Sequence, residues 1–301
     1  MTKAMNRRWP LYALLGAGAA LALYKSHTGH RRRRQLQHGE IRELQNLRST
    51  VNGQQMHARI ATGAARPATL PVVMIHGLGV SGSYFIPAAQ RLATQFDVYA
   101  PDLPGHGLSD TPEVQPDIAG LAQALIDWMD CTGIARACLV GHSMGCQVAV
   151  EVALRHPGRI GRLVLIAPVP DPAARNALQQ FGRLAMGSIF ERPSLIPQVF
   201  KDYLRMGRRF IPEFRAMLAY PIEAKLPDIA VPVMLIRGEH DALAPQPWLD
   251  EAAALLRASP AVVIGYWGHA VHYSGAAQVT ELMRSFLAAE ERDMAPGTRP
   301  G

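Results

Sequence analysis

The sequence predicts an α/β domain built on a mainly parallel, eight-stranded type of sheet with helices on both faces. Two observations predict it. Short apolar runs alternate with longer amphipathic segments along most of the chain, and a Gly-x-Ser-x-Gly pentapeptide lies between one such run and one such segment. Strands of parallel sheets are apolar throughout, because crossover helices bury both faces. The 301 residues suffice for one large domain of this kind with an insertion.

The first 45 residues differ from the rest of the chain in charge and in hydropathy. Residues 1–42 carry nine Lys or Arg against one Glu, whereas the remainder carries 22 basic and 23 acidic side chains. The positive net charge therefore belongs to this segment, and we expect no nucleic-acid-binding face on the domain. Residues 11–24 form an uninterrupted apolar run with arginines on both sides. We interpret residues 1–45 as a membrane anchor that contacts membrane lipid, followed by a linker.

A cleaved export signal is the alternative for this segment, because a basic start and an apolar run are features of both. The 14-residue run is shorter than the roughly 17–25 residues of a typical transmembrane helix. The larger positive charge follows the run, at residues 31–34, and positively charged flanks stay on the cytoplasmic side. The anchor interpretation therefore predicts a cytoplasmic main domain, and the export interpretation predicts an exported one.

The main domain begins with a hairpin at residues 49–61, because Asn52-Gly53 is a strong turn signal between two strand-like runs. The expected strands that follow are residues 72–75, 98–100, 138–140, 163–166, 233–236 and 262–264. The expected helices are residues 84–94, 118–129, 146–155, 248–256 and 279–289.

The alternation stops between residues 170 and 231, which are rich in Arg, Met, Phe, Leu and Pro and contain no strand pattern. We expect a helical cap here, at residues 170–230, inserted between the sixth and seventh strands. The predicted core then consists of residues 46–169 and 231–290, and the Pro/Gly-rich residues 291–301 are expected to form a flexible tail. Nine apolar residues of the cap could line an acyl pocket: Phe181, Leu184, Met186, Ile189, Phe190, Leu195, Ile196, Val199 and Phe200.

Ser143 is the candidate nucleophile. The pentapeptide Gly-His-Ser-Met-Gly places it between a strand and a helix, which is the setting of a nucleophile elbow. A serine hydroxyl needs a base to take its proton. His269, just after the last expected strand, is the candidate base, and His272 is its competitor. We prefer His269 because it follows a glycine and lies closer to the strand end.

Asp241 is the candidate acid that would orient the imidazole. It follows the strand at residues 233–236, and active sites of such sheets collect at the carboxyl ends of strands. Glu239 could instead cap the turn, and Asp171 is the fallback acid because it follows the preceding strand. The backbone N–H groups of Leu78 and Met144 are the candidate oxyanion hole: one lies in the small-residue turn after residues 72–75, and the other follows the nucleophile.

Five motifs in this order resemble the α/β-hydrolase fold family: His-Gly-Leu-Gly, Asp-Leu-Pro-Gly-His-Gly-Leu-Ser, Gly-His-Ser-Met-Gly, Gly-Glu-His-Asp and Gly-His. The resemblance covers about residues 50–287 and implies a serine hydrolase with a helical cap. The chain order Ser143, Asp241, His269 is that of the family's triads. A serine nucleophile speaks against the dehalogenase and epoxide hydrolase branches, which use aspartate.

We expect a hydrolase that cleaves a small-molecule carboxylic ester with an apolar acyl group. Hydrolysis of a carbon–carbon bond in ring-fission products is one alternative, although His142 stands where that branch commonly has Asn. A ligand-binding protein without catalysis is the other. We expect no cofactor and no metal, because the sequence contains neither a dinucleotide-binding glycine pattern nor metal-ligand spacing of Cys and His. The oligomeric state is left open.

Overall fold

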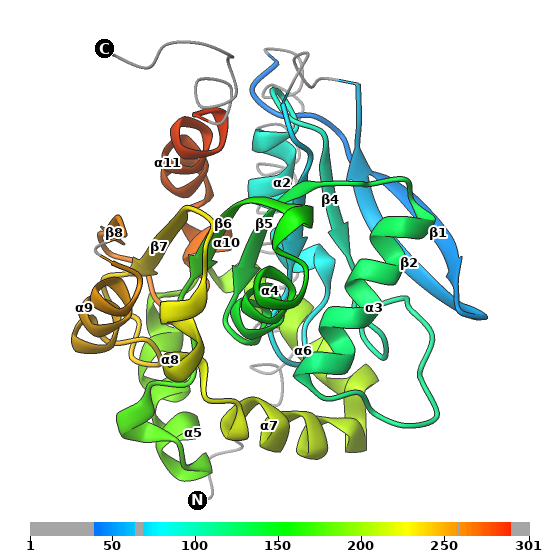
Figure 1. Cartoon of the computed structure of the whole chain (residues 1–301). Coiled ribbons are helices and arrows are strands. Elements are labelled where there is room, and N and C mark those ends of the chain that lie inside the picture. Colours follow the sequence, from blue (N-terminus) through cyan, green and yellow to red (C-terminus); the bar gives the residue numbers. More distant parts are fainter. Residues whose placement is uncertain (1–38, 64–68, 258, 290–301) are drawn as a thin grey trace, which may run out of the picture. The chain divides into compact units, whose positions relative to one another are not determined.

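The computed structural model describes residues 39–63, 69–257 and 259–289. Eight strands form one sheet in the order β1-β2-β4-β3-β5-β6-β7-β8 (Figure 1). β1 and β2 pair as an antiparallel hairpin, β2 pairs antiparallel with β4, and every later pairing is parallel. This sheet, with helices packed along it, confirms the predicted fold class.

The strands lie close to the predicted positions. Their bounds are β1 Gln45–Val51, β2 Gln54–Ala61, β3 Val72–Ile75, β4 Val98–Pro101, β5 Ala137–His142, β6 Ile160–Ile166, β7 Val233–Gly238 and β8 Ala261–Ile264. β1 begins four residues before the prediction, because its pairing with β2 continues to Gln45, opposite Ile60. Its polar side chains are largely exposed at the sheet edge, so hydropathy alone did not indicate its start.

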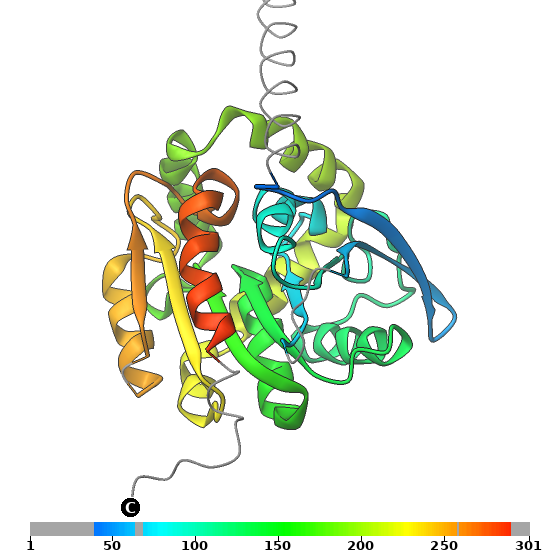
Figure 2. The same cartoon turned by 90° about the horizontal axis from the view of Figure 1, so that it is seen from above.

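The helices of the core cover both faces of the sheet. Their bounds are α2 Ile86–Leu92, α3 Ile118–Cys131, α4 Met144–Arg155, α9 Gln246–Leu255, α10 Val271–Ser274 and α11 Ala276–Ala288. α2 and α11 pack together on one face, and α3 and α4 pack together on the other (Figures 1 and 2). The helix expected at residues 84–94 is divided into a 3₁₀ turn, Gly82–Phe85, and α2, because Pro87 enters at the start of α2.

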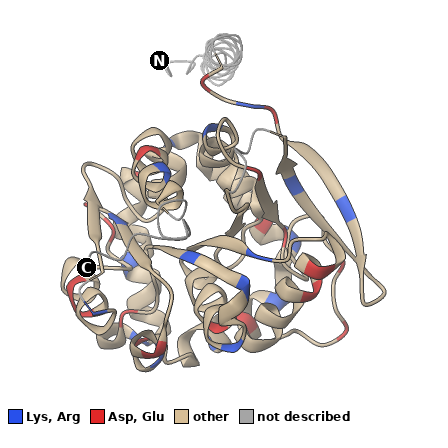
Figure 3. Ribbon diagram, turned by 45° about the horizontal axis from the view of Figure 1, so that its top comes forward, with Lys and Arg blue, Asp and Glu red and all other residues tan. Residues whose placement is uncertain are grey.

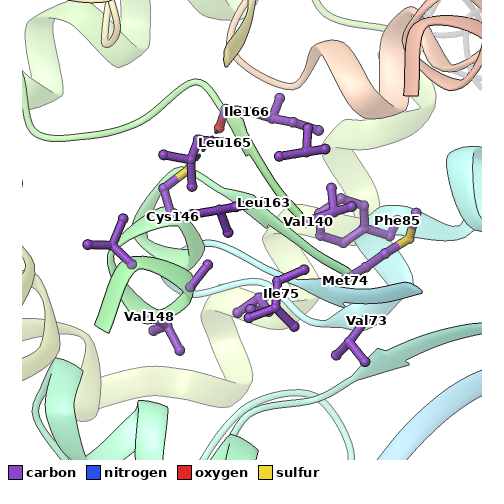
Figure 4. Close-up of a cluster of buried hydrophobic side chains, with 14 of the residues drawn as sticks. Val73, Met74, Ile75, Phe85, Val140, Cys146, Val148, Leu163, Leu165 and Ile166 are labelled. Carbon is purple, nitrogen blue, oxygen red and sulfur yellow. Dashed lines mark hydrogen bonds between the residues drawn. The ribbon is translucent and has the colours of Figure 1, made fainter. Parts of the chain in front are cut away.

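The core lies around the central strands. β3, β5, β6 and β7 are buried along their whole length, as expected for strands covered on both faces. Figure 4 shows part of this core, where Met74 of β3 and Val140 of β5 lie close to Phe85. Cys146 and Val148 of α4 lie in the same cluster. This packing holds the ends of β3, β5 and β6 in fixed relative positions.

The segment between β6 and β7 is helical, as predicted. It contains α5 Ala177–Gly187, α6 Ile196–Met206, α7 Phe210–Ala219 and α8 Ile222–Lys225, and 3₁₀ turns join α5 to α6 and α6 to α7. We refer to residues 170–230 as the insertion. Its division from the core at these residues stays a prediction, as do the other predicted domain boundaries.

The ends of the chain fall largely outside the described residues. The apolar run at residues 11–24 and the tail at residues 291–301 both lie there. Among the helices of the described ranges, none combines the length and the apolar character needed to cross a bilayer.

Candidate active site

Ser143 sits in a tight turn between β5 and α4. Its backbone has φ 56° and ψ −122°, which is unusual for a residue other than glycine. The two glycines of the motif allow the turn: a Cβ on Gly141 would lie 2.5 Å from the Gly145 carbonyl oxygen, and a Cβ on Gly145 would lie 2.1 Å from that of Ile75. Both clashes are with backbone that cannot move aside. The strand and the helix therefore approach closely only with glycine at both positions, and Ser143 lines a cavity.

Asp241 and His269 meet at the ends of β7 and β8. His269 Nδ1 lies 2.9 Å and 3.1 Å from the two Asp241 carboxylate oxygens. The carboxylate is buried, and its Oδ1 also accepts the backbone N–H groups of Leu243 and Ala244. Arg237 donates to the Asp241 carbonyl oxygen and so fixes the loop. Because Nδ1 faces the carboxylate, Nε2 is the ring nitrogen that is available to accept a proton from another group.

Ser143, Asp241 and His269 all line the same cavity. Within the described part of the chain, no hydrogen bond joins the Ser143 hydroxyl to the His269 ring, although both residues line the cavity. Burial alone lowers the pKa of His269, but the charge and hydrogen bond of Asp241, together with the charge of Glu191, outweigh it. The pKa of His269 is therefore raised, and the site favours the charged imidazolium.

The two candidate oxyanion donors lie beside Ser143. Met144 is the first residue of α4, where backbone N–H groups have no partner inside the helix. A Cβ on Gly77 would come within 3.0 Å of the Ser143 Cβ, so the turn that leads to Leu78 passes directly beside the serine. His76 braces this turn, since its Nδ1 donates to the Gly77 carbonyl oxygen and its Nε2 accepts the N–H of Leu103.

The alternative residues have other partners. Asp171 pairs with Arg183 at 2.6 Å and caps a 3₁₀ turn. Glu239 accepts the backbone N–H of Tyr266 at 2.7 Å. His272 is fully buried in α10, with its ring 4.1 Å from that of His142 and 4.7 Å from that of Tyr84, centroid to centroid. None of these three side chains contacts the His269 ring in the described structure.

Two residues near the site were not given a role by the sequence. His142 Nε2 donates to the His269 carbonyl oxygen over 3.0 Å, and burial keeps the pKa of His142 well below its usual value. Glu191, from the insertion, accepts the backbone N–H of Ala270 and the hydroxyl of Ser274, each over 2.6 Å. Burial raises the pKa of Glu191. His142 stands inside the motif and could have been considered, whereas nothing in the sequence near Glu191 indicates its partner.

The cavity has a volume of about 710 Å³. Most of its wall comes from the insertion, and seven of the nine apolar residues expected to line an acyl pocket do line it: Phe181, Leu184, Ile189, Leu195, Ile196, Val199 and Phe200. Met186 and Phe190 do not line it. Phe190 instead stacks on the His240 ring, with the centroids 3.8 Å apart, and so connects the insertion to the loop after β7.

The chain belongs to the alpha/beta hydrolase family, whose model matches residues 72–282. A pimeloyl-[acyl-carrier protein] methyl ester esterase of Stenotrophomonas maltophilia (strain K279a) is 30% identical to it over 72% of this chain and 93% of the relative. An enol-lactonase structure from Burkholderia xenovorans LB400 is 26% identical, with a TM-score of 0.68, over 80% of this chain and all of that one.

The structure of a bacterial membrane phospholipase A superposes with a TM-score of 0.70 over 95% of this chain and 99% of that one. At 21% sequence identity this likeness shows the fold alone. The family and its esterase relatives make this protein a hydrolase of the esterase-like kind.

Proposed function

We propose that the protein is a serine hydrolase that cleaves carboxylic esters with an apolar acyl group. One observation carries this proposal: the His269 ring is held by Asp241 with its Nε2 free to face the cavity in which Ser143 stands at a tight turn. A nucleophile, a base and an orienting carboxylate at the ends of β5, β8 and β7 of one sheet are the elements of acyl transfer.

The proposed reaction has two halves. The Ser143 oxygen attacks the ester carbonyl carbon, and His269 Nε2 takes the hydroxyl proton. The N–H groups of Leu78 and Met144 stabilise the negative oxygen of the tetrahedral intermediate. Collapse breaks the ester C–O bond, and the imidazolium of His269 returns its proton to the leaving alcohol. Water then attacks the acyl-enzyme with the same base, which releases the carboxylic acid and restores Ser143.

The cavity supports an apolar, uncharged acyl group. Its volume of about 710 Å³ lies within the range of roughly 300–1,000 Å³ usual for small-molecule pockets. Among the lining residues, all of which the structure describes, the only arginine or lysine is Arg183, and this guanidinium is paired with Asp171. An anionic acyl group would therefore find no uncommitted Arg or Lys in the cavity wall. Two of the similar proteins are named as a methyl ester esterase and an enol-lactonase, and esters and lactones both contain the acyl C–O bond that the proposed reaction breaks.

A chain-length series of p-nitrophenyl esters tests this function. We expect kcat/KM to rise with acyl length beyond butyrate, because each added methylene gains apolar contact worth about 0.8 kcal/mol when buried. Ser143→Ala should reduce hydrolysis by roughly 10³-fold or more. Ser188→Ala removes the hydroxyl of a second cavity-lining serine and should leave the rate within tenfold. Cleavage of a ring-fission diketone without any esterase activity would favour the carbon–carbon alternative, and tight binding without turnover would favour a binding protein.

We also propose that residues 1–45 attach the protein to a membrane. Arginines flank the apolar run at residues 11–24, and such charges bind anionic headgroups. Cell fractionation tests the idea with the full chain and a variant that lacks residues 1–42, which keeps all of β1. The full chain should stay in the membrane fraction through a high-salt wash, and the deletion should be released. Release of both would contradict the anchor.

A further inference from the structure

Exposed apolar side chains are concentrated on the insertion. Of the thirteen large hydrophobic side chains that are exposed in the described structure, nine belong to it. They form what we call the outer apolar face: Leu178, Phe181, Leu184, Met186, Ile189, Ile196, Phe200, Leu204 and Ile211, with exposed fractions from 40% to 84%. Concentrations of this kind on a folded protein mark binding surfaces, because water-exposed apolar area is costly.

Helix α6 shows how the face is built. Ile196, Phe200 and Leu204 are four residues apart and therefore form one stripe along the helix, and all three are about two-thirds exposed. Val199 and Tyr203, on the adjacent stripe, line the cavity. The helix thus presents apolar side chains in two directions, inward to the cavity and outward to the surroundings. A helix that only covered a core would have a polar outer surface.

The outer apolar face surrounds the entrance of the cavity. Five of its residues line the cavity while at least 40% of each is exposed: Phe181, Leu184, Ile189, Ile196 and Phe200. They come from α5, α6 and the turns between them. An apolar chain could therefore pass from the outer face to the cavity that contains Ser143 without crossing a polar surface.

From α5 to α7 of the insertion, the exposed charge is all of one sign, and the exposed acidic residue of the insertion, Asp228, follows α8. Between residues 171 and 220, every one of which is described, the exposed charged side chains are Arg192, Lys201, Arg205, Arg208 and Arg215. The acidic residues of the same stretch, Asp171, Glu191, Asp202 and Glu213, are buried or half-buried. Elsewhere Lys/Arg and Asp/Glu are interspersed along the ribbon (Figure 3).

Positive charge also borders the apolar stripe on α6. Leu204 and Arg205 follow Lys201 by three and four residues. At these spacings on a helix, both side chains are neighbours of Lys201 on the helix surface. An apolar face with a rim of basic side chains is complementary to a bilayer with anionic headgroups: the apolar residues enter the acyl boundary while the cations meet phosphate.

We propose that the outer apolar face docks on an anionic phospholipid bilayer, from which the acyl chain of the substrate enters the cavity. The second step rests on the proposed esterase function. A second copy of the chain is a poorer occupant, because a two-fold contact would bring the same basic residues against each other. The chain's own residues 1–42 are also poorly suited, since they carry nine basic residues and one Glu.

The test uses the full chain with an environment-sensitive fluorophore on Leu204→Cys, which belongs to the outer apolar face but does not line the cavity. Cys131→Ser removes the exposed native thiol, and Cys138 and Cys146 are buried. The control carries the label on Val263→Cys in β8, a side chain that is 40% exposed. Because the label reports its own surroundings, attachment of the chain through residues 1–45 does not by itself produce a signal.

With phosphatidylglycerol vesicles, the emission at position 204 should shift to the blue and become protected from iodide, whereas position 263 should not change. Phosphatidylcholine vesicles should give a much weaker effect. The double variant Lys201→Glu, Arg208→Glu should bind the vesicles about tenfold more weakly or worse, as measured by the signal at position 204. The reason is that each basic residue near an anionic surface contributes roughly 1 kcal/mol. Arg48→Glu with Arg257→Glu makes the same change in net charge at other exposed positions and should leave the signal intact.

An unchanged signal at position 204 with saturating phosphatidylglycerol, equal shifts at both positions, or protection at position 204 without any vesicles would overturn the proposal. The last result would assign the face to residues 1–45 or to a second copy. Hydrolysis of soluble p-nitrophenyl butyrate is measured in parallel. If the ester is cleaved and position 204 stays in water, only the docking fails; if position 204 enters the bilayer and no ester is cleaved, docking stands and the esterase function fails.

Discussion

Two residues of the candidate triad, Asp241 and His269, are held in position by several hydrogen bonds. Asp241 accepts two backbone N–H groups in addition to the His269 ring, so its carboxylate has a single orientation. His269 is held through its side chain by Asp241 and through its carbonyl oxygen by His142. A base fixed at both ends needs little reorganisation during proton transfer, which is the physical advantage of such a site.

Replacement of Asp241 tests the assignment of the acid. Asp241→Asn should reduce kcat by roughly 10⁴-fold while the protein stays folded, because the amide stabilises the wrong tautomer of the imidazole. Asp171→Asn is the matched control, since Asp171 contacts Arg183 instead of His269. Steady-state hydrolysis of one p-nitrophenyl ester measures both variants. A larger loss in Asp171→Asn than in Asp241→Asn would transfer the role to Asp171.

The pH profile tests the part played by Glu191. His269 must be neutral to accept the serine proton, so kcat/KM should fall as the pH drops through its raised pKa. Glu191→Gln removes a charge that helps to raise that pKa, whereas the amide oxygen can still accept the N–H of Ala270. The acidic limb of kcat/KM should therefore move to lower pH. An acidic limb at the wild-type position would show that the charge of Glu191 does not act on His269.

At the scale of elements, α7 meets the loop after β4 through two buried side chains, Glu213 and His106. His106 Nδ1 donates to the Pro104 carbonyl oxygen, so its Nε2 carries a lone pair, and Nε2 lies 3.3 Å from Glu213 Oε1. Burial raises the pKa of Glu213 to about 8 and lowers that of His106 to about 3. A protonated Glu213 can then donate to His106, while Gln115 donates to the other carboxyl oxygen.

Glu213 contributes a stability that decreases with pH, and comparing Glu213→Gln with the wild type separates it from His106, whose lowered pKa acts in the opposite sense between about 3 and 6.5. The folded-state pKa of about 8 lies above the ordinary value of 4.5, so between these values the folded state binds more protons than the unfolded state. The contribution of Glu213 to the free energy of unfolding should therefore fall as the pH rises from about 4.5 to about 8. Glu213→Gln should remove this contribution and raise the free energy of unfolding at pH 8 by roughly 2–4 kcal/mol. Urea denaturation at pH 5 and pH 8 measures it, and an equal pH dependence in both proteins would refute the neutral pair.

The turn between β5 and α4 depends on its glycines. Gly145→Ala would place a Cβ 2.1 Å from the Ile75 carbonyl oxygen, so we expect the free energy of unfolding to fall by about 3 kcal/mol and activity to be lost. Gly158→Ala is the control, because a Cβ there meets nothing within 4 Å. Its stability should change by less than about 1 kcal/mol. Similar stabilities of the two variants in urea would contradict the account of the turn.

The elements that the sequence predicted well are those whose pattern is local. The buried strands and the turn around Ser143 depend on neighbouring residues, so apolar runs and glycine spacing indicate them. The start of β1 was missed because an exposed edge strand has polar side chains. Glu191 was missed because its hydrogen-bond partner Ala270 is 79 residues away, on another element. No local pattern encodes a contact of that kind.

At the scale of the whole molecule, one cavity connects the fold to its proposed chemistry. The core contributes Ser143, Asp241 and His269 at the ends of β5, β7 and β8, and the insertion contributes most of the apolar wall. The same helices present the outer apolar face with its basic rim. An esterase that takes its acyl substrate from a bilayer would use both surfaces of these helices, one for docking and one for binding the chain.

Covalent labelling with a fluorophosphonate, followed by mass spectrometry of the peptides, tests the central claim most directly. The account predicts one adduct per chain, on Ser143, because the reagent is attacked by an activated serine and stays attached. The adduct should be absent in Ser143→Ala and should form much more slowly in His269→Ala. Labelling of a different residue, or no labelling of the folded protein, would contradict the account.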